Sequence, residues 1–414
     1  MKSLERQAIV YTSVCHGLVH VVELTYGTVL VAIADEFGAT LLALGVLANV
    51  FGLALGLTAL PVGVLADRTG ETRLLMMCCL GMGVSAVIIG LSPNVHVLGG
   101  GLLLLGLALG IFHPVGSAFV ARVATSRGSG FGYMGVGGNV GLALGPILAG
   151  AIASGLGWRA AYFIFAVPAW FLAVMFLLLS RAEAPVVRQP AISTETDRRV
   201  LKPFLVPLLL VVTASVMNGL IYRGAVTFLP LYLSERIQLT VLNWDSVLIA
   251  GSFATIALAF GVVGQYLGGY LADRKRREGI AVVSALATVP LLLVVGHSVG
   301  AVLLCAAAGF AFFHFMGQPV YNALIADYSP AAWRGRLYGV YFFCAMGGGS
   351  FAASILGYVG GELGTNWVFI VAAGFGILAL VCTVFLLIRA LRPAAGGRIG
   401  ARWDRPSQLP PGLD

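Results

Sequence analysis

Charged side chains are scarce in this chain: 10% of its 414 residues are Asp, Glu, Lys or Arg, whereas 59% are hydrophobic. A soluble domain carries about 25% charged residues, so the composition argues against a water-soluble protein. The six cysteines lie in apolar runs without CxxC spacing, which argues against a disulfide framework or a cysteine zinc site. The Gly-x-x-x-x-Gly-Lys motif that binds ATP is also missing. We therefore expect an integral membrane protein that has no cofactor and draws its energy from a gradient.

Apolar runs long enough to cross a bilayer recur along the whole chain. Glycine contributes 55 residues, which suits the close packing of helices in lipid. The first run contains His16, His20 and Glu23, which argues for a retained helix rather than a cleavable signal peptide. The sequence therefore predicts an all-α integral membrane fold of twelve transmembrane helices, over residues 9–34, 41–66, 73–92, 97–121, 131–155, 159–180, 204–233, 246–271, 279–296, 300–326, 337–361 and 366–391.

Lys and Arg are distributed unevenly between the two sides of the predicted membrane. Most of them lie in alternate connections, on the side that also holds both termini, while the other side keeps only Arg159 and Arg236. The positive-inside rule then places both termini in the cytoplasm and the protein in the cell inner membrane. This topology accounts for the net charge of +8, so we expect no nucleic-acid partner.

A short motif after the second predicted helix recurs after the eighth. Residues 63–68 read Gly-Val-Leu-Ala-Asp-Arg, and residues 269–274 read Gly-Tyr-Leu-Ala-Asp-Arg. Because both copies lie on the same side of the membrane, each half must hold an even number of helices. We expect two pseudo-symmetric six-helix bundles with substrate bound between them near the midplane. The expected division is residues 1–180 and 204–392 for the bundles, 181–203 for a cytoplasmic linker and 393–414 for a disordered cytoplasmic tail.

The doubled motif resembles the loop between helices 2 and 3 of the major facilitator superfamily, where Gly-x-Leu-Ala-Asp-Arg is followed by a glycine and further arginines. Residues 111–122 and 137–146, in predicted helices 4 and 5, are similar to the fosmidomycin-resistance branch of efflux transporters within that superfamily. The resemblance implies the twelve-helix major facilitator fold and transport by alternating access.

Asp67 stands at the end of a predicted helix beside a turn at Gly70, where a carboxylate can pair with arginine or cap a neighbouring helix. The resemblance implies a cytoplasmic gate in which Asp67 engages Arg122 and the start of helix 11, with a mirrored set in the second half. The alternative is that these residues determine topology and folding only. The implied gate residues are Asp67, Arg68, Arg73, Arg122, Asp273, Arg274, Asp327 and Arg334.

Predicted helix 1 carries the densest set of ionisable residues at membrane depth. His16, His20 and Glu23 are spaced i, i+4, i+7 and share one helical face. Such groups can bind and release protons as a cavity changes exposure, so this face is our candidate for proton coupling. A structural hydrogen-bond cluster is one alternative. A zinc or iron site, which only His113 or His314 could complete at this depth, is the other, and our expectation is that no metal binds.

Arg223 on predicted helix 7 is the only cation buried within a predicted span, away from its ends, and this helix corresponds to helix 1 in the repeat. We expect Arg223 and Glu23 to face one central cavity, where the guanidinium neutralises Glu23 or binds an anionic substrate. A purely structural ion pair is the alternative, and Asn139 is expected in a bond between helices. The predicted substrate cavity comprises Arg223, Tyr222, Asn218, His113, Ser117, His314, Gln318 and Tyr321.

Gly141, Gly145 and Pro146 resemble the Gly-x-x-x-Gly-Pro motif of proton-coupled exporters in the same superfamily, where small residues four apart let helices pack closely. We expect a secondary transporter, not an enzyme, whose partners are lipid, protons and a small-molecule substrate and which acts as a monomer. The expected activity is export of a small organic solute or drug in exchange for protons. Proton-coupled symport of a small anion is one alternative, and a metal-ion transporter or a non-transport membrane protein is another.

Overall fold

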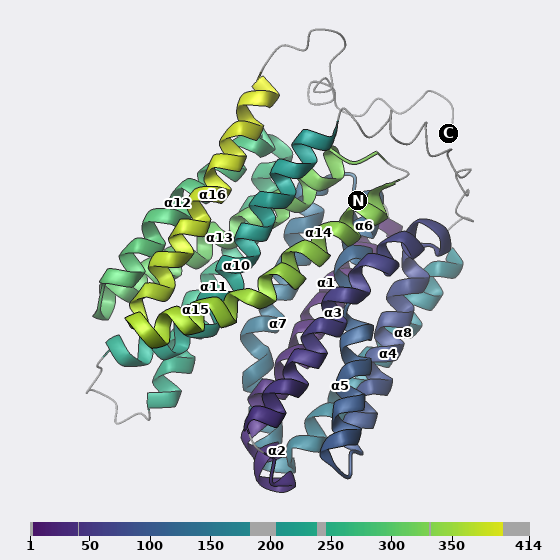
Figure 1. Ribbon diagram of the computed structural model, residues 1–414. Helices are drawn as coiled ribbons and strands as arrows, with labels where there is room; N and C mark the ends of the chain where they lie inside the picture. Colours follow the sequence, from purple (N-terminus) through teal and green to yellow (C-terminus); the bar gives the residue numbers. More distant parts are fainter. Residues whose placement is uncertain (1–2, 40, 183–203, 238–245, 331–332, 392–414) are drawn as a thin grey trace.

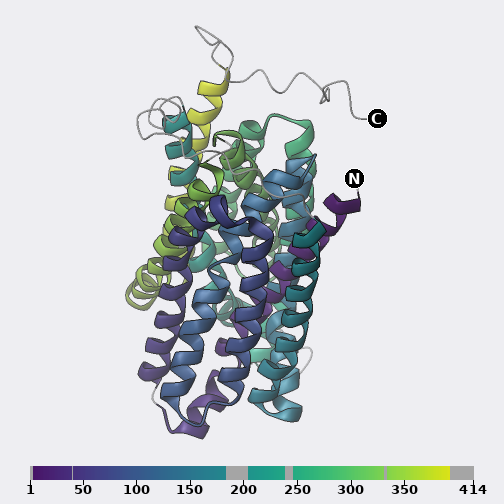
Figure 2. The ribbon, with the colours of Figure 1, turned by 90° about the vertical axis from the view of Figure 1, so that its right-hand side faces the viewer.

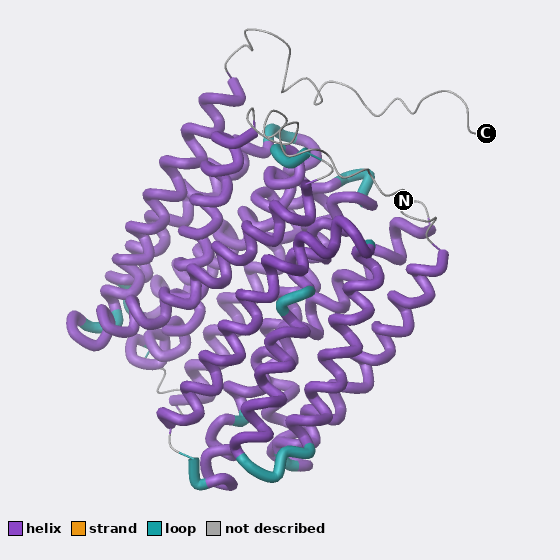
Figure 3. The backbone as a smooth tube through the Cα atoms, turned by 45° about the vertical axis from the view of Figure 1, so that its right-hand side comes forward, coloured by secondary structure: helices purple, strands orange, loops and turns teal. Residues whose placement is uncertain are grey.

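The computed structural model describes residues 3–39, 41–182, 204–237, 246–330 and 333–391, and every regular element among them is helical (Figure 3). Nearly all of the predicted linker and tail lies outside these ranges. The first half of the chain forms α1 (Ser3–Thr28), α2 (Leu30–Phe37), α3 (Leu41–Thr69), α4 (Glu71–Gly90), α5 (Val95–Leu109), α6 (Phe112–Val123), α7 (Arg127–Leu156) and α8 (Trp158–Ala182).

The second half repeats this series of long helices. It forms α10 (Leu205–Arg236), α11 (Ser246–Arg274), α12 (Arg277–His297), α13 (Gly300–Asp327), α14 (Arg334–Phe342), the π-helix η3 (Phe343–Gly347), α15 (Gly348–Leu363) and α16 (Asn366–Leu391).

The twelve stretches predicted from the sequence are all helical. Eleven helices in the described part are long and apolar enough to span a membrane. The remaining stretch, predicted at 337–361, is divided by η3 into two shorter helices that together run from Arg334 to Leu363. The stretch predicted at 97–121 is also divided, into α5 and α6. The ring of Pro114 clashes with a helical carbonyl four residues earlier, at Gly110, and α5 ends directly before that residue.

The long helices lie side by side, and α1 begins at the same end of the molecule at which α16 finishes (Figures 1 and 2). We call this the termini end. In the first half α1 packs against α7 and α4 against α8, and in the second half α11 packs against α13 and α12 against α16. The two six-helix bundles are joined chiefly by α7 with α11 and by α3 with α14.

Large apolar side chains face outward along the peripheral helices. Leu80 of α4, Phe171 of α8 and Phe385 of α16 are 49%, 62% and 59% exposed, respectively. A soluble protein rarely leaves so many large apolar groups in contact with water, whereas a bilayer covers them without penalty. The outer surface is therefore the lipid-facing surface of a multi-pass membrane protein.

Glycine lets the two bundles touch through their backbones at the termini end. A Cβ atom on Gly63 of α3 would lie 2.6 Å from the carbonyl oxygen of Gly335 and 2.8 Å from the Cα of Gly339, both in α14. In the repeat, a Cβ on Gly269 of α11 would overlap Gly128 O and lie 2.6 Å from the Cα of Gly132, both in α7. The glycine of the repeated motif is thus required at both positions for the approach of the opposite half.

A stripe of small residues on α7 holds α1 equally close. A Cβ on Gly141 would overlap the backbone of Gly17, and one on Gly145 would lie 3.1 Å from the Cα of Val21. Pro146 follows within the same unbroken helix. The structure therefore places the predicted packing motif against α1, and this contact fixes the helix that carries the ionisable face.

Candidate functional site

The ionisable face of α1 meets a third histidine from α6. The Nε2 atoms of His16 and His20 are 3.1 Å apart, and His20 Nδ1 lies 2.9 Å from Glu23 Oε2. His113 packs its ring against both, with ring centroids 5.2 Å from His16 and 5.6 Å from His20. All three histidines are buried. The break between α5 and α6 brings His113 to the cluster, so α1 and α6 build it together.

Hydrogen bonds fix the protonated nitrogen of two of these rings. His16 Nδ1 lies 2.7 Å from the carbonyl oxygen of Met134, which can only accept, so Nδ1 carries the hydrogen. Glu23 pairs with Arg223, and because an ionised carboxylate can only accept, His20 donates from its own Nδ1 in this ion-paired form. With both Nδ1 atoms protonated, the two Nε2 atoms, 3.1 Å apart, can share a hydrogen bond only when one of the two rings carries a second proton.

Arg223 connects the second half of the chain to this cluster. Its Nη2 donates to Glu23 Oε1 at 3.2 Å, between α10 and α1. The Glu23 side chain is 9% exposed, whereas the Arg223 side chain is 37% exposed because it borders a cavity. The structure thus brings together the two residues that were expected to face one central cavity, but only Arg223 lines the cavity and Glu23 lies behind it. Part of the guanidinium remains available to a solute.

A cavity of about 130 Å³ lies between the halves at this point. His16, His20 and six of the eight predicted substrate residues line it, the six being Arg223, Tyr222, Asn218, His113, Gln318 and Tyr321. Ser117 and His314 lie outside the lining. Ser117 is enclosed where α6 is buried on all sides, and His314 packs between the rings of Phe310 and Phe315.

Several lining residues were not singled out from the sequence as cavity residues. Asn139, expected in a bond between helices, lines the cavity, and its Nδ2 has no hydrogen-bond partner among the described residues. Gln265 of α11 donates to Gln318 Oε1 at 2.6 Å and so orients a predicted cavity residue. A lone polar residue in an apolar helix could have revealed Gln265. The other polar side chains in the lining are Ser215, Asn322 and Tyr341.

At the termini end, the second copy of the repeated motif caps a helix of the first half. Asp273 Oδ1 accepts from Gly128 N at 2.7 Å, and its Oδ2 accepts from Ser129 N at 2.6 Å. These amides belong to the first turn of α7, where a negative charge is favourable. The sequence allowed an aspartate in this motif either to pair with arginine or to cap a neighbouring helix. For Asp273, the helix cap is the contact that crosses between the bundles.

Arginines surround this cap. Arg277 pairs with Asp327 at 2.5 Å and with Asp273 at 3.6 Å, and Arg127 of α7 pairs with Asp327 at 3.2 Å. Asp273 and Asp327 were predicted gate residues, whereas Arg127 and Arg277 were not among them. Both arginines stand at the first residue of a helix, so their positions beside a predicted aspartate could have indicated them.

The other predicted gate residues are more dispersed. Arg122 pairs with Glu71 at 3.1 Å, and Arg274 stacks over the ring of Tyr270. Arg68 and Arg73 are exposed, and Arg334 is partly buried at the start of α14. The side chain of Asp67, the predicted partner of Arg122, lies outside the described part of the structure.

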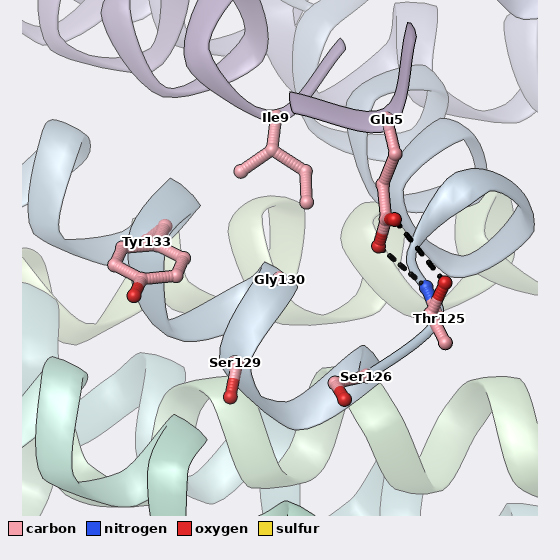
Figure 4. A pocket seen from close by; sticks show the side chains of 7 residues that line it. All are labelled: Glu5, Ile9, Thr125, Ser126, Ser129, Gly130 and Tyr133. Atoms are coloured by element: carbon pink, nitrogen blue, oxygen red, sulfur yellow. Dashed lines mark hydrogen bonds between the residues drawn. The ribbon is translucent and has the colours of Figure 1, made fainter. Parts of the chain in front are cut away.

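A larger hollow of about 380 Å³ opens beside the cap, between the start of α1 and the start of α7. Figure 4 shows Glu5 accepting from the backbone and hydroxyl of Thr125, with Ser126, Ser129 and Tyr133 along the wall. Ser129 also donates to Asp273. The hollow therefore borders the junction between the bundles rather than the central cavity.

At the end of the molecule opposite the termini end, the described polar contacts each join residues of the same half of the chain. Glu36 of α2 pairs with Arg159 and accepts from Trp158 Nε1 at 2.8 Å, both in α8. Both hydrogen bonds lower the pKa of the Glu36 carboxyl, and the bond from Arg159 has the larger effect. In the second half, Thr365 donates to Glu235 at 2.6 Å. The described polar contacts that cross between the bundles are those of the termini end and of the central cavity.

Twelve helical stretches in two six-helix bundles, with a polar cavity between them, define a multi-pass membrane transporter rather than an enzyme. The family model of the Major Facilitator Superfamily matches residues 12–353, and the chain belongs to this superfamily.

Two curated relatives are multidrug resistance proteins MdtG. That of Salmonella paratyphi A is 30% identical and that of Salmonella typhi is 29% identical, each over 252 residues. The match covers 56% of this chain and 57% of each relative, so it spans little more than half the length of either protein.

Solved structures share the fold at low sequence identity. The human organic anion transporter MFSD10 (TETRAN) has a TM-score of 0.75 at 15% identity, with 92% of this chain and 99% of that chain covered. The proton:xylose symporter XylE, bound to 6-bromo-6-deoxy-D-glucose, has a TM-score of 0.78 at 13% identity, with 93% and 96% covered. FucP in the outward conformation has a TM-score of 0.72 at 13% identity, with 91% and 98% covered.

Proposed function

We propose that this protein exports a small organic solute in exchange for protons across the cell inner membrane, with both termini in the cytoplasm. The observation that carries this proposal is the ion pair between Glu23 and Arg223, which joins the two halves beside the central cavity. Its carboxylate contacts His20, and His20 in turn contacts His16. Export rather than import is supported by the similarity to multidrug resistance proteins and by the exporter-like motif on α7.

The ion pair gives a physical basis for exchange. When Glu23 is ionised it holds Arg223 and keeps the cavity wall in the form that binds the solute, and protonation of Glu23 breaks the pair and disfavours that form. Binding of a proton and binding of the solute would then disfavour one another, which is the coupling that exchange requires. His20 donates to Glu23 and provides a route for the proton into the cavity.

The contacts at the termini end support the state in which the cavity is closed toward the cytoplasm. Backbones meet at two glycine contacts, and Asp273 caps α7 across the junction. In the proposed cycle, residues 1–180 and 204–392 move as two bundles, and the cap and the glycine contacts break when the cavity opens inward. Asp67, Arg68, Arg73, Arg122, Arg274, Asp327 and Arg334 are assigned to the same gate.

Efflux measurements test the proposal. A strain that expresses the protein and a strain that lacks it would be loaded with a panel of small organic solutes, and retention would be followed with and without a proton gradient. We expect lower retention of at least one solute in the expressing strain, with the difference abolished by collapsing the gradient. Equal retention of all solutes under both conditions would contradict export.

Symport of a small anion is the second candidate function, and the partly exposed guanidinium of Arg223 favours it. It predicts the opposite sign in the same assay, namely accumulation of an organic or inorganic anion that rises as the external pH falls. Substituting Arg223 by Gln would abolish this accumulation.

A further inference from the structure

Three imidazoles converge at the wall of the central cavity. The ligand atoms of His16, His20 and His113 all lie within 4.8 Å of one another, and the two Nε2 atoms of the α1 pair are 3.1 Å apart. A tetrahedral Zn²⁺ ion with bonds of about 2.0–2.1 Å places neighbouring nitrogens about 3.3–3.4 Å apart. The spacing of the α1 pair is therefore close to that of two histidines on one metal ion.

The hydrogen bonds orient these rings as metal ligands are oriented. A histidine that binds a metal ion through one nitrogen commonly donates from the other to a carbonyl or a carboxylate. His16 donates to the carbonyl of Met134 and His20 donates to Glu23. Each ring thus turns its Nε2 atom toward the other, and this pair of nitrogens can hold either a shared proton or a metal ion between them.

His113 supplies an independent observation. It is 6% exposed, and its Nε2 has no hydrogen-bond partner among the described residues. A buried polar nitrogen without a partner costs free energy, and a metal ion at the cluster would satisfy it.

We propose that His16, His20 and His113 bind one divalent transition-metal ion, for which imidazole is a favoured ligand, such as Zn²⁺ or Co²⁺. The three histidines leave a fourth coordination position, which faces the cavity and stays open to water or to a solute. Glu23 acts here as a positioning residue for His20 rather than as a ligand. The inference stands on the cluster alone and does not depend on the direction of transport or on the identity of the organic solute.

Direct binding of Zn²⁺ to the purified full-length protein in detergent tests the site. We expect one Zn²⁺ per chain by titration calorimetry. In His113→Gln, which loses one of three ligands, the affinity should fall by more than the ~10- to 100-fold that loss of an outer-shell partner causes. The matched control is His314→Gln, which alters a buried histidine outside both the cluster and the cavity lining, and this variant should bind Zn²⁺ as the unmodified protein does. Glu23→Gln should lower the affinity by about 10- to 100-fold.

Co²⁺ provides a second measurement that needs no variant. Bound Co²⁺ with three imidazoles and one further ligand should show the intense visible absorption of four-coordinate cobalt, whereas the hydrated six-coordinate ion absorbs weakly. This spectrum decides the matter if His113→Gln fails to fold. Absence of stoichiometric Zn²⁺ binding, a six-coordinate Co²⁺ spectrum, or Zn²⁺ binding unchanged in a folded His113→Gln protein would each overturn the proposal.

Discussion

Glu23 is bound from two directions, by a histidine of its own helix and by an arginine of the other bundle. The carboxylate is nearly enclosed, while its guanidinium partner reaches the cavity. Removing one partner of a buried pair costs more than removing both, because the remaining charge stays without compensation. The chemistry of a single carboxylate thus connects the folding of the protein with its proposed transport cycle.

Substituting Glu23 by Gln should abolish transport driven by a pH gradient while leaving solute exchange without a gradient intact. Gln keeps the shape and hydrogen-bonding capacity of Glu but cannot titrate. The loss of stability should be smaller than the ~3–5 kcal/mol typical of fully buried pairs, because Arg223 is partly exposed. Transport in proteoliposomes and thermal unfolding would be measured beside Glu362→Gln, an exposed glutamate of α15. Full gradient-driven transport by the folded variant would remove Glu23 from the coupling mechanism.

Asp273→Asn should slow turnover and leave solute affinity nearly unchanged, because the residue caps α7 at the junction and does not line the cavity. Asn loses the charge that the helix N-terminus favours, which weakens the closed state by roughly 1–2 kcal/mol. Initial transport rates and equilibrium binding would be compared with those of Asp35→Asn, an exposed carboxylate of α2. A variant that lost binding but kept fast transport of bound solute would contradict the gate assignment.

At the scale of the helices, the close approach of α3 to α14 and of α7 to α11 depends on the absence of side chains. A Cβ at Gly63 or Gly269 would collide with backbone atoms of the opposite half. Backbone atoms cannot move aside as the end of a flexible side chain can, so any larger residue must push the helices apart.

Gly269→Leu should therefore destabilise the state that is closed at the termini end and favour the opposite one. We expect a cysteine placed on the cavity side of α13 to become more reactive from the termini side, and transport to fall because one half of the cycle is blocked. Gly279→Leu in α12 is the matched control, since a Cβ there meets nothing within 4 Å. Equal labelling of the two variants would show that the glycine contact has no part in closure.

The sequence was sufficient for the helices and for the ionisable face of α1. Bilayer thickness and the helical period constrain both, so the spans and the sharing of one face by His16, His20 and Glu23 could be read directly. The addition of His113 to this cluster depended on the break after α5. The helix cap of Asp273 and the bond between Gln265 and Gln318 depended on which helices of the two halves meet, and no local pattern encodes that approach.

At the scale of the whole molecule, the distribution of Lys and Arg predicts the orientation in the membrane. Reporter fusions or cysteine labelling at positions 190 and 400 should report the cytoplasm, because most of the basic residues share that side with the termini. Labelling from the outside at either position, in cells with an intact membrane, would contradict the proposed orientation and the even helix count.

The two glycine contacts also bear on the origin of the chain. Gly63 of the first half meets Gly335 and Gly339 of the second, while Gly269 of the second half meets Gly128 and Gly132 of the first. Exchanging the two halves converts one contact into the other. Two identical subunits that meet through an isologous interface show the same pattern. A single ancestral six-helix chain bearing these glycines would have made both contacts by pairing with itself, so duplication and fusion of its gene could preserve the interface without inventing a new one.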